Sequence, residues 1–396
     1  MMIGGQERKS KMKYHFEFLS AGLAMAVLTA AMSLPAVPSA GSPSVSAAAQ
    51  EKPRSGRELY LAACANCHGP DGKSVSQSLL GFDLRIRDFT DCQATNREPD
   101  ADWVAVGLKG GPARGFSELM PAFEGVLTPG EVGLVVKHMR TFCPDQNWAR
   151  GELNMPRALA TEKAFPEDEA VVTSAIDAEG DGRIANKLIY EQRLGARNQL
   201  EIIAPFGWQK SSVEPGSPDW SSSLGDLAVG IKRVFYHSFE RGSIFSAAAE
   251  LVTPTGDEAR GFGKGTFIFE PFLSFGQLLP AEFFLQAQTG VELPFQTSKA
   301  ENEGFLRLVL GRGFDIGKWD RSWTPMVELV GAGELSGGAV IDWDIIPQFQ
   351  VTLNTRKNIM ANFGVRVPVN NTSGRHVQVV FYLLWDWFDG TLFEGW

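Results

Sequence analysis

The last two-thirds of the chain, from Ala170 to Trp396, is dominated by alternating apolar and polar residues. The clearest case runs from Ile341 to Leu353, where every second residue is apolar and only Pro347 interrupts an ideal strand. The same alternation recurs over residues 283–293 and 361–367. A period of two is typical of a β-strand with one apolar face. We find no convincing helical pattern here and therefore predict an all-β region.

Counting such segments gives about twelve strands, each bounded by turn-forming residues. They are expected near Ala170–Ala178, Arg183–Leu194, Gln199–Trp208, Asp226–Tyr236, Ser243–Val252, Thr266–Phe275, Glu282–Leu293, Phe305–Phe314, Pro325–Gly333, Val340–Leu353, Ile359–Val369 and Val377–Trp387. The gaps at Gln209–Gly225, Thr253–Gly265 and Gln296–Gly304 are long and polar, and they alternate with shorter ones. Membrane barrels show this alternation, with long outer loops and short periplasmic turns.

Two architectures fit the pattern: a soluble sandwich that buries its apolar face, and a membrane barrel that turns this face toward lipid. Strands of about ten residues with bulky aliphatic and aromatic faces favour the barrel. The segment Ser223–Leu227 (SLGDL), followed by an alternating strand, also resembles outer-membrane proteins of the family named for meta-pathway phenol degradation. That resemblance is short, and it implies the same barrel fold.

If the apolar face points outward, the opposite face lines an acidic lumen. It collects Glu250, Glu270, Glu292, Glu328, Asp342, Asp344 and Asp386, with Arg307 and Arg366 among them. An acidic lumen would favour the passage of cations or protons over anions. In the alternative interpretation the acids and arginines pair with one another and fill the interior, and then the barrel carries no open channel.

The region before the strands has a helical pattern. Residues 55–65 predict a short helix, and Thr128–Glu131 is a capping box with Pro at the first helical position, so a second helix is expected from Pro129 to Phe142. Residues 144–169 lack periodicity and contain three Pro residues. We predict an α + β two-domain chain: a small all-α domain at 50–143, a linker at 144–169 long enough to search for partners, and an antiparallel β-barrel of about 12 strands at 170–396.

The N-terminal residues 1–49 have the pattern of a secretory signal peptide. Arg8, Lys9, Lys11 and Lys13 precede an apolar run from Phe18 to Leu34, and small residues suit cleavage after Ala47 or Ala49. The full-length charge of −9 includes +2 from this segment, four basic residues against Glu7 and Glu17, which leaves about −11 for the rest. Such acidity argues against nucleic acid as a partner.

Cys64-Ala65-Asn66-Cys67-His68 is a C-x-x-C-H sequence, in which two thiols bond to haem vinyl groups and the imidazole binds the iron. A structural zinc site would require a second ligand pair, and the sequence has none. A dithiol redox pair would follow a strand rather than a helix. Met120, 52 residues after His68 and followed by Pro121, offers a thioether as second axial ligand.

The order helix, C-x-x-C-H, Met-Pro and closing helix resembles the class I c-type cytochromes over about Arg54 to Phe142. The resemblance implies one haem c bound through Cys64 and Cys67, with His68 and Met120 on the iron, and a close crossing of the two terminal helices at Gly56. The chain departs from the family by a longer middle, Ser74–Glu98, which would cover a haem edge or present a docking surface. Trp103 and Arg114 are candidates for the haem propionates, the alternatives being a packed Trp and a solvated Arg.

Two further cysteines, Cys92 and Cys143, bracket the long middle and the end of the last helix. A disulfide between them would staple the insertion to the exit of the domain and would require an oxidising compartment. Two unpaired buried thiols are the alternative. The disulfide prediction is consistent with export.

Together these features predict an exported protein of the outer membrane whose haem domain lies in the periplasm. The expected partners are periplasmic or membrane redox proteins and outer-membrane lipid, and the favoured role is one-electron transfer rather than enzymatic catalysis. The alternatives are a transport barrel for small solutes with an accessory redox domain, and an oxidase of an external donor such as Fe(II). The last resembles fused cytochrome-porin iron oxidases, whose haem segment is much smaller.

Overall fold

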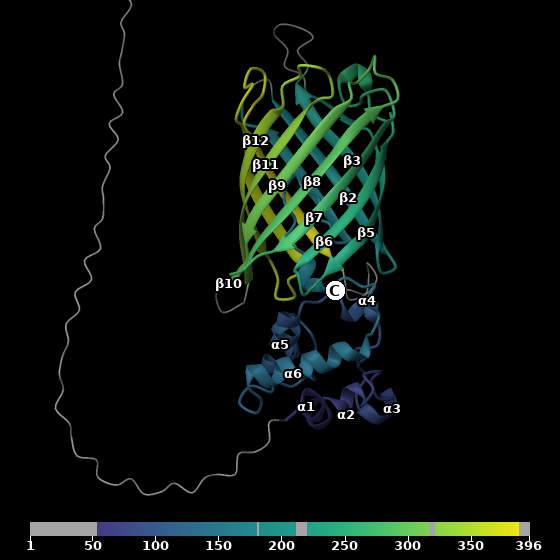
Figure 1. The fold of residues 1–396 in the computed structure, drawn as a ribbon, viewed down its shortest axis with the longest axis vertical. Coiled ribbons are helices and arrows are strands. Elements are labelled where there is room, and N and C mark those ends of the chain that lie inside the picture. Colours follow the sequence, from purple (N-terminus) through teal and green to yellow (C-terminus); the bar gives the residue numbers. More distant parts are fainter. Residues whose placement is uncertain (1–53, 180–181, 211–219, 317–320, 388–396) are drawn as a thin grey trace, which may run out of the picture. The chain divides into compact units, whose positions relative to one another are not determined.

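The computed structural model describes residues 54–179, 182–210, 220–316 and 321–387, all of which fall within one compact unit, Pro53–Trp396. The expected signal peptide, residues 1–49, lies outside the described residues. Within them, a helical domain is followed by a single antiparallel sheet (Figure 1). No helix among the described residues is both long and apolar enough to cross a bilayer.

The helical domain contains six α-helices and two short 3-10 helices. They are α1 (Gly56–Ala63), α2 (Ala65–His68), α3 (Gln77–Leu80), α4 (Cys92–Thr95), α5 (Asp100–Lys109), η1 (Gly111–Arg114), α6 (Pro129–Met139) and η2 (Arg140–Phe142). The predicted capping box of α6 is confirmed, because Thr128 and Glu131 exchange backbone-to-side-chain hydrogen bonds. A second capping box, formed by Ser55 and Glu58, starts α1. Each satisfies backbone N–H groups that a helix start otherwise leaves open.

Helices α1 and α6 cross in close contact, as the resemblance implied for Gly56. A β-carbon at Gly56 would lie 2.1 Å from the carbonyl oxygen of Leu134, so no larger residue fits without moving a backbone. The buried apolar stripe of α6, formed by Val132, Val135, Val136 and Met139, packs against Leu59 and Tyr60 of α1. This crossing forms the core of the helical domain.

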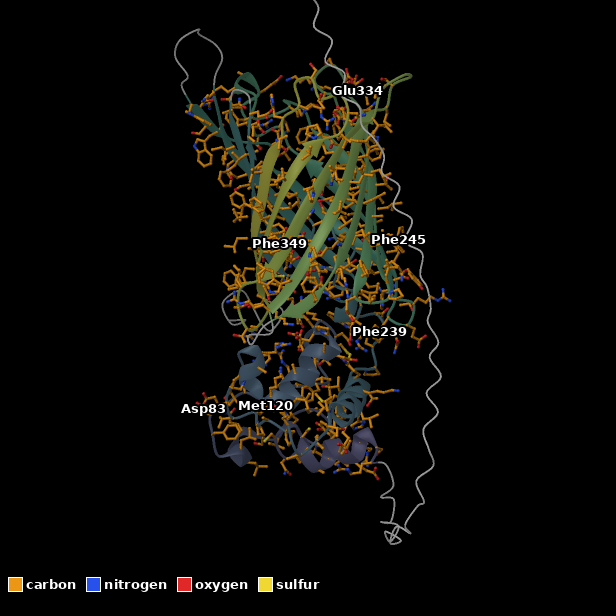
Figure 2. The ribbon with its side chains drawn as sticks, turned by 90° about the vertical axis from the view of Figure 1, so that its left-hand side faces the viewer. Asp83, Met120, Phe239, Phe245, Glu334 and Phe349 are labelled. Carbon is orange, nitrogen blue, oxygen red and sulfur yellow. A yellow bond between two sulfur atoms is a disulfide. The ribbon has the colours of Figure 1, made fainter. Side chains whose placement is uncertain are left out.

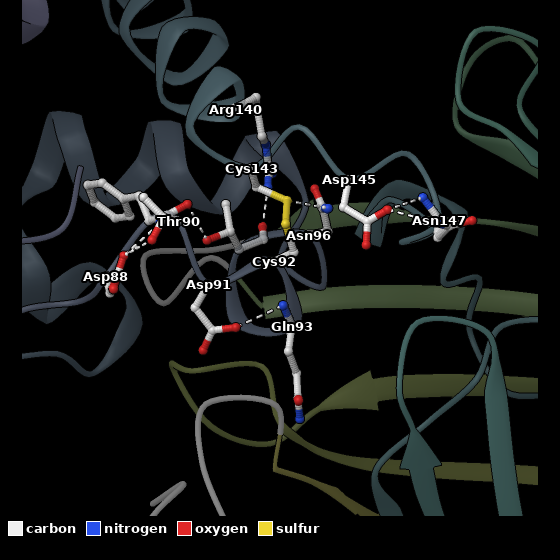
Figure 3. The surroundings of a disulfide bond; sticks show 12 residues. Asp88, Thr90, Asp91, Cys92, Gln93, Asn96, Arg140, Cys143, Asp145 and Asn147 are labelled. Atoms are coloured by element: carbon white, nitrogen blue, oxygen red, sulfur yellow. Dashed lines mark hydrogen bonds between the residues drawn. A yellow bond between two sulfur atoms is a disulfide. The ribbon is translucent and has the colours of Figure 1, made fainter. Parts of the chain in front are cut away.

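Cys92 and Cys143 form a disulfide in the structure (Figure 3). It joins the first residue of α4 to the end of η2, and the Asn96 side chain donates a hydrogen bond to the Cys143 sulfur at 3.1 Å. The disulfide thereby fastens the long middle of the domain, Ser74–Glu98, to the residues at the end of the helical domain.

The sheet closes into a barrel of twelve strand positions, as predicted. Its elements are β1 (Glu169–Asp177), β2 (Arg183–Leu194), β3 (Asn198–Lys210), β4 (Trp220–Leu224), β5 (Ala228–Ser238), β6 (Ser243–Val252), β7 (Ile268–Leu278), β8 (Phe283–Pro294), β9 (Glu303–Arg312), β10 (Phe314–Ile316), β11 (Arg321–Glu334), β12 (Asp342–Thr352), β13 (Ile359–Pro368) and β14 (Gln378–Asp386). Pairing of β1 with β14 and of β9 with β11 closes the ring. The short β4 and β10 lengthen the strands formed by β5 and β9, since each pairs with the same neighbour.

The predicted apolar face points outward and the polar face inward. On β12, Ile345 and Phe349 are each 40% exposed, whereas Gln348 and Gln350, the polar neighbours of Phe349 in the sequence, are buried. Figure 2 shows Phe349 on the barrel wall. A soluble sandwich would bury this apolar face, so the outward aliphatic and aromatic surface excludes that alternative and fits a lipid-facing barrel.

Short and long connections lie at opposite ends of the barrel, because antiparallel strands alternate in direction. Residues 195–197, 239–242, 279–282 and 353–358 make short turns at one end. The long connections at 253–267 and 295–302, and the described parts of 211–227, lie at the other. The segment that enters β1 from the helical domain meets the end with the short turns.

Residues 154–168, which we call the plug segment, are not the free linker expected from the sequence. Ala158, Phe165 and Glu167 are each no more than 2% exposed, and the segment makes hydrogen bonds to strands around the ring. Its partners include Gln199 of β3, Gln286 and Gln288 of β8, Arg307 of β9, Glu328 of β11, Gln348 of β12, Asn362 of β13 and Tyr382 of β14. The expectation of a long free reach for the helical domain is therefore wrong, since the chain is folded into the lumen.

Candidate functional site

A cavity of about 1390 Å³ lies in the helical domain and is lined by all four residues predicted to hold haem. Cys64, Cys67 and His68 contribute to one part of its lining, and Met120 contributes from a distant part of the sequence. Apolar side chains of α5 and α6 line it as well, including Val132, Val135 and Val136. The structure thus brings the C-x-x-C-H motif and the Met-Pro motif to one site.

The C-x-x-C-H residues are fixed by the junction of α1 and α2. The Cys64 backbone N–H donates to Tyr60 and the His68 N–H donates to Cys64, at 2.8 and 3.0 Å. The buried Tyr60 hydroxyl donates to the carbonyl of Gly69 at 2.7 Å, just beyond α2. The imidazole of His68 stacks on Phe89, with ring centroids 4.6 Å apart. The ring is consequently held in one place by packing.

Burial sets the protonation of these groups in a direction that suits iron ligation. Loss of solvation lowers the pKa of His68 to about 4, with a partial offset from the backbone of Arg87, so the imidazole is neutral at neutral pH. A neutral imidazole is the form that binds metals. Burial, followed by the charge of Cys67, raises the pKa of the Cys64 thiol to about 11. Redox-active dithiols depend on a lowered thiol pKa, so Cys64 does not fit that alternative.

The loop that carries Met120 is held tightly against the end of α5. The Gly111 N–H donates to the Met120 carbonyl at 3.0 Å, and the Phe123 N–H donates to the Gly107 carbonyl at 3.1 Å. Gly110 has φ of +82°, and a β-carbon there would approach the Met120 carbonyl to 2.9 Å. The glycine allows this close approach, which positions Met120 at the cavity.

The long middle of the domain forms one wall of the cavity, as expected for a segment that covers a haem edge. Its lining residues include Val75, Leu80, Phe82, Leu84, Ile86 and Phe89. Trp103 also lines the cavity, and its indole Nε1 is buried without a hydrogen-bond partner among the described residues. Arg114 is 4% exposed and forms an ion pair with Asp102 at 2.5 Å, so it is not the solvated Arg of the alternative.

These features fit a haem group. The donor set is two thiols, an imidazole and a thioether, which is the set used by c-type cytochromes with a Met ligand. The cavity is larger than the roughly 300–1,000 Å³ of usual ligand pockets. The buried Trp103 N–H is a donor in need of an acceptor such as a propionate carboxylate.

Three other residues with side chains that could bind iron, Met139, Met155 and His138, take other roles in the structure. Met139 is buried in the apolar stripe of α6 and also lines the cavity wall. Met155 lies in the barrel, in a cluster with Ile244 and Phe284. The ring of His138 packs on Tyr60 and Phe142, with centroids 5.4 and 5.1 Å apart. Met120, in the Met-Pro motif, is therefore the candidate for the second protein ligand of the iron.

The lumen of the barrel is filled by paired charges rather than left as an acidic channel. Arg157 of the plug segment contacts Glu169 and Glu191, both fully buried, at 2.5 and 3.0 Å. Lys163 contacts Glu167 and Glu169. On the barrel wall, Arg366 pairs with Asp344 and Glu328 accepts hydrogen bonds from Thr161. The filled lumen agrees with the alternative that has no open channel, and Asp344 forms the expected pair with Arg366, whereas no ion pair of Glu250, Glu270, Glu292 or Asp386 occurs among the described residues.

The plug segment was missed because no periodic pattern marks it. The seven acids assigned to the lumen gave no indication of this segment, because Arg157 and Lys163 pair with Glu167, Glu169 and Glu191, none of which is among the seven.

The helical domain and the barrel are joined by a buried contact. Arg97 forms an ion pair with Asp168, and both side chains are 2% exposed. Asp168 also accepts hydrogen bonds from the backbone of Arg193 and the side chain of Gln192, each at 2.7 Å. The cavity described above is lined in part by Asp168, Gln192 and Trp387. The barrel therefore contributes to the wall of the cavity.

Comparison with known families agrees with both domains. Residues 51–139 match the family model described as cytochrome C oxidase, cbb3-type, subunit III, and residues 172–359 match that of the MetA-pathway of phenol degradation. The chain is a cytochrome c-type domain fused to an outer-membrane β-barrel. No curated protein shows a significant match to this cytochrome–barrel chain.

Solved structures similar to part of this chain include an outer membrane channel and two porins. An outer membrane channel from Pseudomonas putida F1 is 15% identical, with a TM-score of 0.41 over 58% of this chain and 99% of that one. The KdgM porin is 11% identical, with a TM-score of 0.37 over 55% of this chain and 98% of that one. The NanC porin is 8% identical, with a TM-score of 0.36 and coverage of 55% and 98%.

Proposed function

We propose that this protein transfers single electrons through one haem c in its periplasmic domain, while the barrel anchors that domain in the outer membrane. The observation that carries the proposal is the single cavity lined by Cys64, Cys67, His68 and Met120. Bound haem c supplies one-electron exchange between Fe(III) and Fe(II). The residues of the chain attach the haem and bind its iron.

The two thiols provide covalent attachment. Each S–H would add across a vinyl group, so that a carbon–sulfur bond forms and the hydrogen goes to the other vinyl carbon, without an external oxidant. The neutral imidazole of His68 would bind the iron. The thioether of Met120 would be a second ligand, which would favour a higher potential and exclude small molecules from the iron. These features favour electron transfer over catalysis on a bound substrate.

The orientation follows from the two ends of the barrel. The plug segment and β1 meet the helical domain at the end that carries the short turns. Outer-membrane barrels place short turns in the periplasm. The cytochrome domain then faces the periplasm, where redox proteins of that compartment or of the membranes would exchange electrons with it.

The plug segment favours an anchoring barrel over a transport pore. It crosses the lumen with hydrogen bonds to strands on several sides, including Glu328, Gln348 and Tyr382. A solute would have to displace paired buried charges. One haem also does not span an apolar band about 25 Å tall, so electrons that cross the membrane would need a further carrier.

The test is visible spectroscopy of the detergent-extracted outer-membrane fraction in the oxidised and reduced states. We expect one haem c per chain and a weak far-red band that marks Met coordination of Fe(III). Met120→Ala should lose that band and retain covalent haem, whereas Met155→Ala, matched in residue type but located in the barrel, should keep it. Haem in the soluble periplasmic fraction alone would contradict the anchoring role, and a band that survives Met120→Ala would contradict the ligand assignment.

A further inference from the structure

Three carboxylates from distant parts of the chain meet in the lumen of the barrel. Glu162 belongs to the plug segment, Glu201 to β3 and Glu250 to β6. One carboxylate oxygen of each lies within 4.8 Å of the oxygens of the other two. The side chains of Glu201 and Glu250 are buried, with 4% and 6% exposure. The three acids therefore share a space that is largely withdrawn from water.

The sheet brings Glu201 and Glu250 together across a glycine. Gly230 of β5 is the direct cross-strand partner of both acids. A β-carbon at Gly230 would lie 2.8 Å from Cγ of Glu250 and 3.6 Å from Cβ of Glu201. Because Gly230 has no side chain, the acids of β3 and β6 can approach each other over the intervening strand.

The cations of the chain do not pair with these three carboxylates. Arg157 and Lys163 of the plug segment form their ion pairs with other acids. Lys187 of β2 acts electrostatically on Glu250, but no ion pair within the described ranges includes Glu162, Glu201 or Glu250. Like charges repel strongly where water is excluded. The group therefore needs positive charge from a bound cation or from protons.

An unpartnered atom in the group favours a bound ion. Oε2 of Glu201 is buried, and no hydrogen-bond donor reaches it from the part of the chain that the structure describes. Buried polar atoms of native proteins are almost always satisfied, and an exception indicates an ordered water or ion beside them. Here the unpartnered oxygen belongs to a carboxylate that faces two further carboxylates. An acceptor in these surroundings suits a cation.

We propose that Glu162, Glu201 and Glu250 form a binding site for one calcium ion between the plug segment and the barrel wall. All three donors are oxygens, which hard cations prefer. Calcium binds oxygen at about 2.3–2.6 Å, so ligands on opposite sides of the ion are about 5 Å apart, which fits the spread of these carboxylates. Magnesium needs shorter bonds and a stricter octahedral geometry. The ion would fasten the plug segment to two strands of the barrel.

A row of further acids joins this site to the end of the barrel that carries the long loops. Glu270 is the direct cross-strand partner of Glu250, and Glu303 is the direct partner of both Glu292 and Glu334. Glu334 is the last residue of β11, next to the loop that leads to β12 (Figure 2). Acidic side chains along a barrel wall favour cations. The row offers calcium a route from the outer face.

The experiment is equilibrium dialysis of the full-length protein in detergent against radioactive calcium, after a chelator has removed bound metal. The unsubstituted protein should bind one calcium ion per chain, with weak competition from magnesium. Glu201→Gln and Glu250→Gln should each weaken binding by about tenfold or more, because each removes one charged ligand and keeps the side-chain size. Glu258→Gln, an exposed acid of the loop between β6 and β7 that pairs with Lys299, is the matched control and should bind normally.

Thermal unfolding separates loss of the ion from loss of the fold. Calcium should raise the Tm of the unsubstituted protein and of Glu258→Gln, and it should leave the Tm of Glu250→Gln unchanged. Without calcium, Glu250→Gln should melt no lower than the unsubstituted protein, since it relieves repulsion between like charges. A lower Tm of Glu250→Gln without calcium would show that Glu250 supports the fold without an ion, and would overturn the proposal.

The remaining outcomes are equally decisive. Calcium binding of equal strength in the unsubstituted protein and in both glutamine variants of the site would overturn the assignment of these ligands. Equal competition by magnesium would overturn the choice of calcium. Absence of calcium binding would overturn the proposal, and a Tm that then rises as the pH falls would identify protons as the charge that neutralises the three carboxylates.

Discussion

The two domains of this protein treat their interior space in opposite ways. The cytochrome domain keeps its apolar residues inside, and it leaves a cavity of about 1390 Å³ lined by the predicted haem ligands. The barrel turns its apolar residues outward, and its interior is occupied by residues 154–168 of its own chain with paired charges. One space suits a cofactor and the other is filled by polypeptide. This difference indicates that an enclosed space can bind a ligand only where residues of the same chain do not already fill it.

The largest effect is expected from removing the covalent attachment of haem to the cytochrome domain. Replacing both Cys64 and Cys67 with Ser should abolish covalent haem, because no thiol remains to add to the vinyl groups. The measurement is haem staining of the denatured protein after electrophoresis. The double variant Cys92→Ser, Cys143→Ser is the control and should keep the stain. Stain retained without Cys64 and Cys67 would refute the attachment site.

The corresponding test of the barrel is to remove the filling of its lumen. Replacing residues 157–163 with a Gly-Ser segment of equal length removes Arg157 and Lys163, and should convert a silent barrel into one that conducts ions. Single-channel recording in planar bilayers measures the change. The same replacement at residues 335–341, in the uncharged loop between β11 and β12, should remain silent. Equal conductance of the unsubstituted protein would show that the plug segment does not close the pore.

Removal of one buried positive charge from the lumen tests how much the charge pairs there stabilise the barrel. Arg157→Met removes the ion-pair partner of the buried Glu191 and leaves the buried Glu169 with Lys163 alone, and should lower the free energy of unfolding by about 3–5 kcal/mol. Urea unfolding in detergent, followed by tryptophan fluorescence, measures the loss. Arg260→Met breaks an exposed pair with Asp257 and should cost no more than about 1 kcal/mol. Similar losses in both variants would mean that the buried network is not the source of stability.

The smallest expected effect concerns the disulfide of the cytochrome domain. Opening Cys92–Cys143, which spans a sequence separation of 51, should destabilise this domain by about 2–4 kcal/mol on the chain-entropy argument. Urea titration of the haem absorption measures the effect, with the unsubstituted protein and the Cys92→Ser, Cys143→Ser variant compared in the fully oxidised state. No reductant is added, because it would reduce the haem iron as well as the disulfide. Equal urea midpoints for the two proteins would contradict a stabilising role of the disulfide.

Much of the fold followed from local patterns. Period-two alternation placed twelve strands and their outward faces, because a side chain on a strand has only two directions. The capping box placed the start of α6, since the orphan N–H groups there have local partners. The four residues predicted to bind haem come from two short motifs, and the structure places all four on one cavity. The disulfide partners were inferred from the positions of the two remaining cysteines.

The path of residues 154–168 was decided only by tertiary structure. Their burial depends on partners far along the sequence, such as Glu191 for Arg157 and Glu328 for Thr161. The same holds for the seam, where Arg97 meets Asp168 and Arg356 meets Phe116. A periodic sequence pattern indicates which side of a helix or strand is buried, and an irregular segment has no such pattern. By itself the sequence determined the strands and the first and last helices of the cytochrome domain and predicted the residues that bind haem, whereas the closed barrel and its long-range charge pairs decided what fills the lumen and where the cytochrome domain is held.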